Sequence, residues 1–435
     1  MAQPNFIYGL DENPPLVKGI LYGLQWVMIT IPSVMIFSAL CSVALGLGPE
    51  GQISFSQRLL IVIGIMTILQ SLKGHRYPVL EGPSQAVLLS FIVLAPQGLP
   101  VIEGGLIFGS LLLVLLGAFK GFKKLAPLFT TNVIGVILML VGFTLLPFIT
   151  PLVIGTDRVH PYGDLSVSVC SVLIMLFVSI LSHWVGGFFQ TVSMLLGILF
   201  GWVLYLGQGK ISFTVVGESA WFSLPSPLVG AWPAFSVPAI LSMVLTYLAV
   251  MVNSVGSIQG ISEIVGKEGL EGRLNRGIFM NGIGGVLAAV SGTAGLVSIS
   301  LSTGVVLVSR VASRYVLTIS GGLTVLCAFV PKLWALLTVI PPSVIAAVLF
   351  VSISSQLVAG MNVILSRKKE FERREYFSIG MPLLLGGAVS ILPKPFFQFL
   401  PESISPLISN GLVVGLCFSI FSEHLLFRPR KPRVV

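Results

Sequence analysis

Residues 77–94 read YPVLEGPSQAVLLSFIVL, an apolar segment with Gly82 and Pro83 near its start. A second segment, SGTAGLVSISLSTGVV at 291–306, contains three glycines and a run of hydroxyl side chains. Both are too interrupted and too polar for a helix that faces lipid along its whole length. Irregular backbone inside a membrane is tolerated only where it is buried or lines a cavity. The two segments therefore predict a pair of broken helices around a site near mid-membrane.

The composition of the chain places these segments in a membrane. Of 435 residues, 55% are hydrophobic and 9% are charged, whereas a soluble globular protein has about 25% charged residues. The 45 residues between Asp164 and Lys210 contain no Asp, Glu, Lys or Arg, which is enough for two spans. The four cysteines are dispersed in apolar runs, so neither a disulfide framework nor a metal site is expected. This composition also argues against a nucleic-acid binder and a conventional soluble enzyme.

The apolar runs predict fourteen helices, which begin near residues 18, 57, 78, 101, 125, 165, 188, 235, 276, 293, 315, 338, 376 and 404. Of the 25 basic residues, 20 are Lys18 or lie in the loops that follow helices 2, 4, 8, 10, 12 and 14. The other five are Arg58, Arg158, Lys210, Lys332 and Lys394. The basic side is expected to be cytoplasmic, with both termini there. This asymmetry accounts for the net charge of +9 without a nucleic-acid partner.

Fourteen helices divide into two seven-helix repeats, residues 1–208 and 209–435. Because each repeat has an odd number of helices, the second is inverted in the membrane. The broken segments are then the third helix of each repeat, helices 3 and 10 of the whole chain. Half-helices that start at mid-membrane present unpaired N–H groups and positive dipole ends, which suit a small ligand rich in carbonyl oxygens. The alternative is that their glycines and serines only allow helices to pack closely.

Several local motifs occur in the order and spacing of a known family. They are PPL (14–16), GLQW (23–26), YPVLEGPSQA (77–86), EIVGKEGLEGRLNRGIFMNGIGG (263–285), LSTGVVLVSR (301–310) and PP (341–342). From about Pro14 to Leu426 the chain resembles the nucleobase–ascorbate transporter family of uracil, xanthine and uric acid permeases.

The resemblance implies an all-α integral membrane protein of the plasma membrane, with bacterial relatives. It implies a core domain of helices 1–4 and 8–11 and a gate domain of helices 5–7 and 12–14. The ligand would lie between them, held by helices 3, 8 and 10, while the core moves against the gate. Symport with a proton or sodium and a homodimer are also implied.

The sequence departs from the family at the residues that hold the base. Asn253 replaces a helix 8 Glu, Ser257 replaces a His or Asp, Leu301 and Ser302 replace a Gln or Glu and an Asn in helix 10, Gln85 replaces an aromatic residue, and Trp26 replaces a His. Gly304 and Arg310 of the helix 10 signature are retained. The usual ionisable clamp on the substrate is therefore missing.

A nucleobase edge alternates N–H donors and C=O acceptors, and a carboxamide side chain offers both. The candidate substrate-binding residues are Asn253, Gln85, Ser84, Ser300, Leu301, Ser302 and Gln25, with Gly82, Pro83 and Gly304 as structural or hinge residues. The alternative for each amide is a hydrogen bond between helices, worth about 0.6 kcal/mol in a membrane. We favour ligand contact for Asn253 and helix–helix contact for Gln25.

An amide cannot take up a proton, so proton coupling requires a different acid. Glu81, just before the helix 3 break, is the candidate, because an ionisable residue at membrane depth is usually functional. The alternative is an acid stabilised by the dipole of the half-helix that follows. Glu103, Glu263 and Glu423 lie near the ends of other predicted helices. Without a coupling group, the protein would be a facilitative carrier.

An anion carrier and an intramembrane enzyme are the two alternatives to a nucleobase permease. Sulfate and other anion exchangers resemble this fold, and a neutral site between two positive dipole ends would suit an anion. The helix 8–9 loop and the helix 10 signature favour the permease. An intramembrane enzyme is not expected, because the chain contains no HExxH motif, catalytic-serine elbow or paired intramembrane aspartates, and each of the four histidines is near a predicted loop or helix end.

The sequence therefore predicts a multi-pass permease in a lipid bilayer, without a cofactor, and with purines such as xanthine, hypoxanthine or uric acid favoured over uracil. The purine preference follows from Asn253 and Leu301, which replace larger or more polar groups and enlarge the apolar part of the site.

Overall fold

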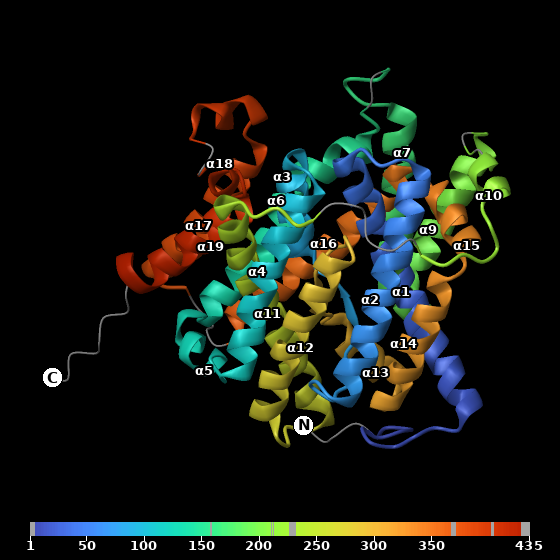
Figure 1. Cartoon of the computed structure of the whole chain (residues 1–435), viewed down its shortest axis with the longest axis horizontal. Coiled ribbons are helices and arrows are strands. Elements are labelled where there is room, and N and C mark those ends of the chain that lie inside the picture. The colour runs from blue at the N-terminus through green and yellow to red at the C-terminus, as the bar shows by residue number, and fades with distance from the viewer. Residues whose placement is uncertain are drawn as a thin grey trace.

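The computed structural model describes residues 5–156, 159–209, 211, 213–225, 232–366, 371–401 and 404–427, and most of them are helical (Figure 1). Among these residues, seven helices are long and apolar enough to cross a membrane. They are α1 (Leu16–Leu45), α2 (Pro49–Leu72), α4 (Leu99–Ala118), α6 (Thr131–Ile154), α7 (Leu165–Trp184), α11 (Val237–Val265) and α16 (Pro342–Leu365). A bent pair, α14 (Arg314–Ala328) and α15 (Pro331–Thr338), passes the same test with an angle of 79° between its halves. The predicted helical membrane fold is confirmed.

The remaining helices are shorter or more polar. They are α3 (Gln85–Leu94), α5 (Phe122–Leu125), α8 (Phe188–Thr191), α9 (Ser193–Gly207), α10 (Thr214–Glu218), α12 (Leu270–Val290), α13 (Leu301–Ser309), α17 (Arg373–Ile391), α18 (Ser405–Ile408) and α19 (Gly411–Phe421). Short segments of other helix types cover Ala95–Gln97 (η1), Ala126–Leu128 (η2), Lys394–Phe399 (η3) and Ser422–Leu426 (η4). Helix α7 begins at the predicted residue, and α1, α4, α11 and α14 begin within two residues of their predicted starts. The count of fourteen spans and the inverted relation of the two repeats stay predictions.

The predicted start of the second helix was wrong. Pro49 in the first turn, followed by Glu50, begins α2 eight residues before the predicted position 57. Arg58 therefore lies well inside α2 rather than at its start, and its side chain is buried. A Cβ atom added to Gly292 would lie 3.1 Å from Arg58 Nη1 and 3.2 Å from Glu103 Oε1, so the two charged groups converge there. Of the other basic residues assigned to that side, Arg158 and Lys210 lie outside the described residues.

Glycines allow two pairs of helices to touch backbone to backbone. In the pair α2 and α14, a Cβ atom at Gly64 would lie 2.6 Å from the Gly321 carbonyl oxygen. In the pair α6 and α16, a Cβ atom at Gly135 would lie 2.6 Å from the Gly360 carbonyl oxygen. Small residues at helix crossings are typical of membrane proteins, because dispersion contacts replace the missing hydrophobic drive.

The helices form two groups of neighbours. Helix α4 packs against α11 and α12, and α2 packs against α1 and α14. Helix α6 packs against α16, α17 and α19. In Figure 1, α17 and α19 lie on the side of the molecule opposite α14 and α15.

Asn410 joins the second group to the first. Its Oδ1 caps α19 by accepting hydrogen bonds from the N–H groups of Leu412 (3.2 Å) and Val413 (3.3 Å). Its Nδ2 donates to Ser90 Oγ on α3 (2.7 Å) and to Ser242 Oγ on α11 (3.3 Å). All the polar side chains in this Asn410 cluster are fully buried, so each depends on the others for hydrogen bonds.

Both predicted breaks are extended strands that pair with each other. Strand β1 (Glu81–Pro83) runs antiparallel to β2 (Leu296–Ser298), with Glu81 opposite Ser298. Two further hydrogen bonds extend this ribbon, from Ser84 N to Gly295 O and from Ile299 N to Leu80 O, both 2.9 Å long. Helices α3 and α13 leave the ribbon at opposite ends. Their N-termini therefore face each other across it.

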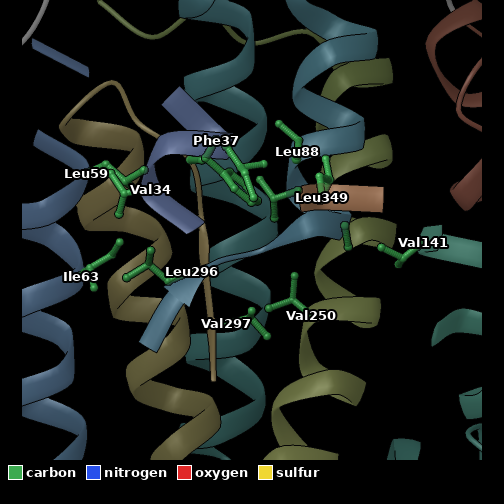
Figure 2. Close-up of a cluster of buried hydrophobic side chains, with 14 of the residues drawn as sticks. Val34, Phe37, Leu59, Ile63, Leu88, Val141, Val250, Leu296, Val297 and Leu349 are labelled. Carbon is green, nitrogen blue, oxygen red and sulfur yellow. The ribbon is translucent and has the colours of Figure 1, made fainter. Parts of the chain in front are cut away.

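Apolar side chains fix the ribbon between the helices (Figure 2). Leu296 of β2 points toward Ile63 of α2, and Val297 points the other way, toward Val250 of α11. Such alternation is what a strand imposes on successive side chains. The ribbon is therefore an internal element buried on both faces.

Candidate substrate site

A cluster of polar side chains lies beside the end of the ribbon at Ser298, on α11 and just before α13. Ser257 Oγ of α11 donates to the Ser298 carbonyl oxygen at 2.7 Å. It also forms a 2.7 Å hydrogen bond with Ser300 Oγ, in which either hydroxyl can be the donor. Ser300 Oγ in turn donates to Asn253 Oδ1 at 3.3 Å. Asn253 is partly exposed and Ser300 is exposed. Among the described residues no acceptor is within hydrogen-bond distance of Asn253 Nδ2, so this amide can still donate to a ligand.

Gln85 is the first residue of α3, at the other end of the ribbon. Its Nε2 donates weakly to Ser352 Oγ of α16, at 3.5 Å. Its Oε1 is buried, with no hydrogen-bond partner among the residues that the structure describes. An unpaired buried amide oxygen costs about 1–3 kcal/mol. Gln85 therefore has an acceptor available for a ligand N–H group between α3 and α16.

Three other predicted site residues are occupied by the protein itself. Ser84 Oγ accepts from Val87 N (3.4 Å) and so caps α3, while Ser302 Oγ accepts from Leu80 N (3.0 Å). Each of these serines is 1% exposed. Gln25 donates to Thr191 Oγ1 of α8 at 3.0 Å, which is the helix–helix contact that we favoured for it.

The remaining predicted residues are apolar or glycine. Leu301 is 44% exposed at the start of α13. Gly304, one turn further on, has open space where a side chain would be. At Gly82 a Cβ atom would clash with Ile299 Cδ1, so glycine allows the strands to pack, and Pro83 ends β1. The structure thus brings Asn253, Ser257 and Ser300 together and places Gln85 at the far end of the ribbon.

The acids have very different surroundings. Glu81 is 1% exposed, and its Oε1 accepts from Ser298 Oγ at 2.6 Å. Glu423 pairs with Arg374 at 2.8 Å and also accepts from Thr130 Oγ1 at 3.2 Å. Glu263 is largely exposed and pairs with Lys267 at 2.6 Å. Of the four candidate acids, Glu81 is the one that belongs to the ribbon, and its carboxylate joins β1 to Ser298 of β2.

Sequence reasoning missed His75. It was placed near a loop or helix end, but the structure buries it completely, with Nε2 3.7 Å from Glu81 Oε1. The available signal was a histidine in the short polar stretch KGHRY that separates α2 from the broken segment.

Residues 17–394 match the family model Xan_ur_permease, which is described as a permease family. The chain belongs to the nucleobase–ascorbate transporter family. The predicted family is therefore confirmed, and this family member is a multi-pass membrane permease.

Relatives with assigned names are distant but match nearly end to end. A putative purine permease of Clostridium perfringens is 27% identical to this family member over 430 residues, which are 98% of this chain and 94% of the relative. The uric acid transporter UacT of Escherichia coli is 26% identical over 406 residues, covering 92% and 84% of the two chains. The names of these relatives describe permeases rather than enzymes.

Two solved structures with similar folds are a bicarbonate transporter and an anion transporter. The transmembrane domain of the cyanobacterial bicarbonate transporter BicA has a TM-score of 0.56 and 14% identity, covering 94% of this chain and 99% of that domain. Murine Slc26a9 in the inward-facing state has a TM-score of 0.64 and 13% identity, covering 94% and 69%. At such low identities these likenesses show the fold alone.

Proposed function

We propose that this family member carries purine bases such as xanthine, hypoxanthine or uric acid, in preference to uracil. The observation that carries the proposal is the Asn253 side chain beside the ribbon. It is partly exposed, its Oδ1 contacts only the Ser300 hydroxyl, and its Nδ2 is free among the described residues.

The chemistry of this group matches a base edge. Nδ2 can donate to a base carbonyl while Oδ1 accepts from the neighbouring ring N–H. Because Ser300 is also bonded to Ser257, its hydroxyl can turn away from Asn253 without losing its partner. Gln85 offers a second acceptor from the other end of the ribbon. A two-ring purine extends further from Asn253 toward Gln85 than a one-ring pyrimidine does. The exposed Leu301 offers apolar surface for the second ring of the purine.

An anion fits the same groups less well. Anion binding at a helix start depends on free backbone N–H groups. At α13 the N–H groups of Ser302 and Thr303 already donate to the carbonyls of Ile299 (3.2 Å) and Ser300 (3.3 Å). The candidate groups Asn253, Ser300 and Gln85 are neutral. The anion transporter alternative therefore rests on the shared fold, because none of these three candidate side chains carries a positive charge that would bind an anion.

Alternating access would move a core of α1–α4 and α11–α15 against a gate of α6–α9 and α16–α19. The two groups of packed helices support this division. Gln85 and Ser352 belong to opposite groups, so a base held at Gln85 would contact both. We place both termini on the cytoplasmic side and expect a homodimer, as the family resemblance implies.

A binding panel tests this proposal. Purified protein in detergent is titrated with xanthine, hypoxanthine, uric acid, uracil, sulfate and bicarbonate, and its thermal unfolding is recorded. Stabilisation by at least one purine, weaker stabilisation by uracil and none by the anions is the expected result. Stabilisation by sulfate or bicarbonate alone would replace the nucleobase assignment with the anion transporter alternative.

A further inference from the structure

A buried histidine and a buried carboxylate face each other beside the ribbon. His75 is 0% exposed and Glu81 is 1% exposed, and His75 Nε2 lies 3.7 Å from Glu81 Oε1. The backbone N–H of Tyr77 donates to His75 Nδ1 at 3.0 Å. Nδ1 is therefore an acceptor, and the neutral ring carries its proton on Nε2, the nitrogen nearer Glu81.

Each of the two side chains has an unused polar atom. Among the described residues, neither His75 Nε2 nor Glu81 Oε2 has a hydrogen-bond partner, and both atoms are buried. Burying an isolated carboxylate is very costly, and taking up a proton removes most of that cost. The pair therefore has a place for one more proton, on Glu81 Oε2, which no other group in the described structure uses.

The surrounding groups do not neutralise Glu81. Gln70 of α2, Ser254 of α11 and Asn281 of α12 are neutral. The charged group nearest His75 in the hydrogen-bond network is Arg273 of α12, which donates to the carbonyls of His75 (3.2 Å) and Arg76 (2.7 Å).

The guanidinium group of Arg273 also lies 4.5 Å above the centre of the Tyr77 ring. Its hydrogen bonds go to backbone carbonyls, so it positions the loop. Arg76, next to His75, has a buried Nε without a partner in the described structure, and no ion pair joins it to Glu81 there. The carboxylate thus depends on a bound proton for neutralisation, because the neutral His75 ring can only direct an N–H group toward it.

We propose that His75 and Glu81 form a proton-binding site whose occupancy is linked to the base at Asn253. One proton binds the Glu81 carboxylate, while the neutral His75 ring beside it keeps its own proton on Nε2. This inference rests on the proposed nucleobase function, and it supplies the coupling group that an amide at position 253 cannot.

A continuous set of hydrogen bonds links the two places. Ser298 donates through Oγ to Glu81 and accepts at its carbonyl from Ser257, which contacts Ser300, the partner of Asn253. A carboxylate can only accept, whereas a carboxylic acid also donates. Protonation of Glu81 therefore removes the charge that strengthens its hydrogen bond from the Ser298 hydroxyl, in the strand that ends beside the substrate amide.

The spacing of the pair is held from two sides. Gln70 Oε1 accepts from His75 N at 3.3 Å, and Gln70 Nε2 donates to Asn281 Oδ1. Asn281 donates to Ser254 Oγ, which accepts from Ser298 N at 3.3 Å. The backbones of His75 and Ser298 thus belong to one buried network, which limits how far Glu81 and His75 can separate.

Two assays on the full chain in proteoliposomes test the proposal. Counterflow measures exchange of radiolabelled xanthine or hypoxanthine against unlabelled base without any ion gradient. Accumulation is measured with an imposed inward proton gradient, and separately with an inward sodium gradient. The variants are Glu81→Gln and His75→Gln. Glu263→Gln is the control, because Glu263 is an exposed acid of α11 whose ion pair is with Lys267 and not with a residue of the ribbon.

Wild type is expected to accumulate base with the proton gradient and not with sodium. Glu81→Gln keeps counterflow but loses about tenfold or more in proton-driven accumulation, within the range for coupled sites. His75→Gln shifts the pH of half-maximal accumulation, and Glu263→Gln matches wild type. Proton-driven accumulation that is retained in Glu81→Gln, or accumulation driven by sodium alone, overturns the proton site. Counterflow of base in the same preparations would still support the nucleobase function.

If wild type shows no counterflow of any base, the proposed function fails, and the proton site fails with it. If Glu81→Gln does not fold, proton uptake by wild type decides instead. Adding xanthine or hypoxanthine to lightly buffered protein should change the number of bound protons by up to about one near the midpoint pH. No change across the whole pH range overturns the proposal.

Discussion

Replacing Asn253 with alanine should weaken base binding strongly and leave the fold intact. The amide can make two hydrogen bonds to a base, one as donor and one as acceptor. Neutral hydrogen bonds contribute about 0.5–1.5 kcal/mol each, so their joint loss costs about 1–3 kcal/mol. This free energy corresponds to a rise in Kd of roughly 5- to 150-fold. The protein itself loses only the 3.3 Å hydrogen bond from Ser300, which keeps its 2.7 Å contact with Ser257.

The assay is equilibrium binding of radiolabelled xanthine and hypoxanthine to purified protein, with the melting temperature measured in parallel. Asn362→Ala is the matched control, because Asn362 is an exposed amide on α16. Its Kd and melting temperature should equal those of wild type. The reasoning is refuted if Asn253→Ala binds both bases as tightly as wild type while its melting temperature falls, because Asn253 would then be a structural contact between helices.

Three further predictions concern stability and are read from thermal unfolding in detergent. Gly292→Ala should destabilise by about 1–2 kcal/mol, because φ at this position is +59° and the new Cβ would meet two buried charged groups. Gly387→Ala, where the added Cβ meets no other atom, should not destabilise the protein. Equal losses of stability in the two variants would contradict this prediction. Asn410→Ala should cost about 2–4 kcal/mol, since the Asn410 cluster loses four buried hydrogen bonds, and an unchanged melting temperature would rule that cluster out. Glu423→Gln should destabilise more than Glu263→Gln, because the first ion pair is mostly buried and the second exposed, and a reversed order would refute the comparison.

The sequence was sufficient to locate the two breaks, because they depend on local chemistry. Glycine and proline at 82–83 and a glycine- and serine-rich run at 291–300 cannot continue a helix easily. Periodicity and apolar length also placed the start of α7 and, within two residues, those of α1 and α11. These features follow from residues that are neighbours in the chain.

What the sequence could not show depends on residues far apart in the chain. Glu81 and Ser298 are separated by 217 positions, and only the register of the ribbon makes them partners. The same register brings Ser302 to Leu80 N, and no local pattern distinguishes this structural hydrogen bond from a ligand contact. The burial of Arg58 was also missed, because a charge near a predicted helix end looks like a loop residue until its partner on α4 is known.

Transport itself tests the central claim most directly. Radiolabelled xanthine, hypoxanthine, uric acid and uracil are offered to proteoliposomes that contain the wild-type protein, with excess unlabelled base, sulfate or bicarbonate as competitors. We predict uptake of at least one purine that exceeds uptake of uracil, is abolished by unlabelled purine and is unaffected by the anions. Uptake of labelled sulfate or bicarbonate without uptake of any base would contradict the assignment.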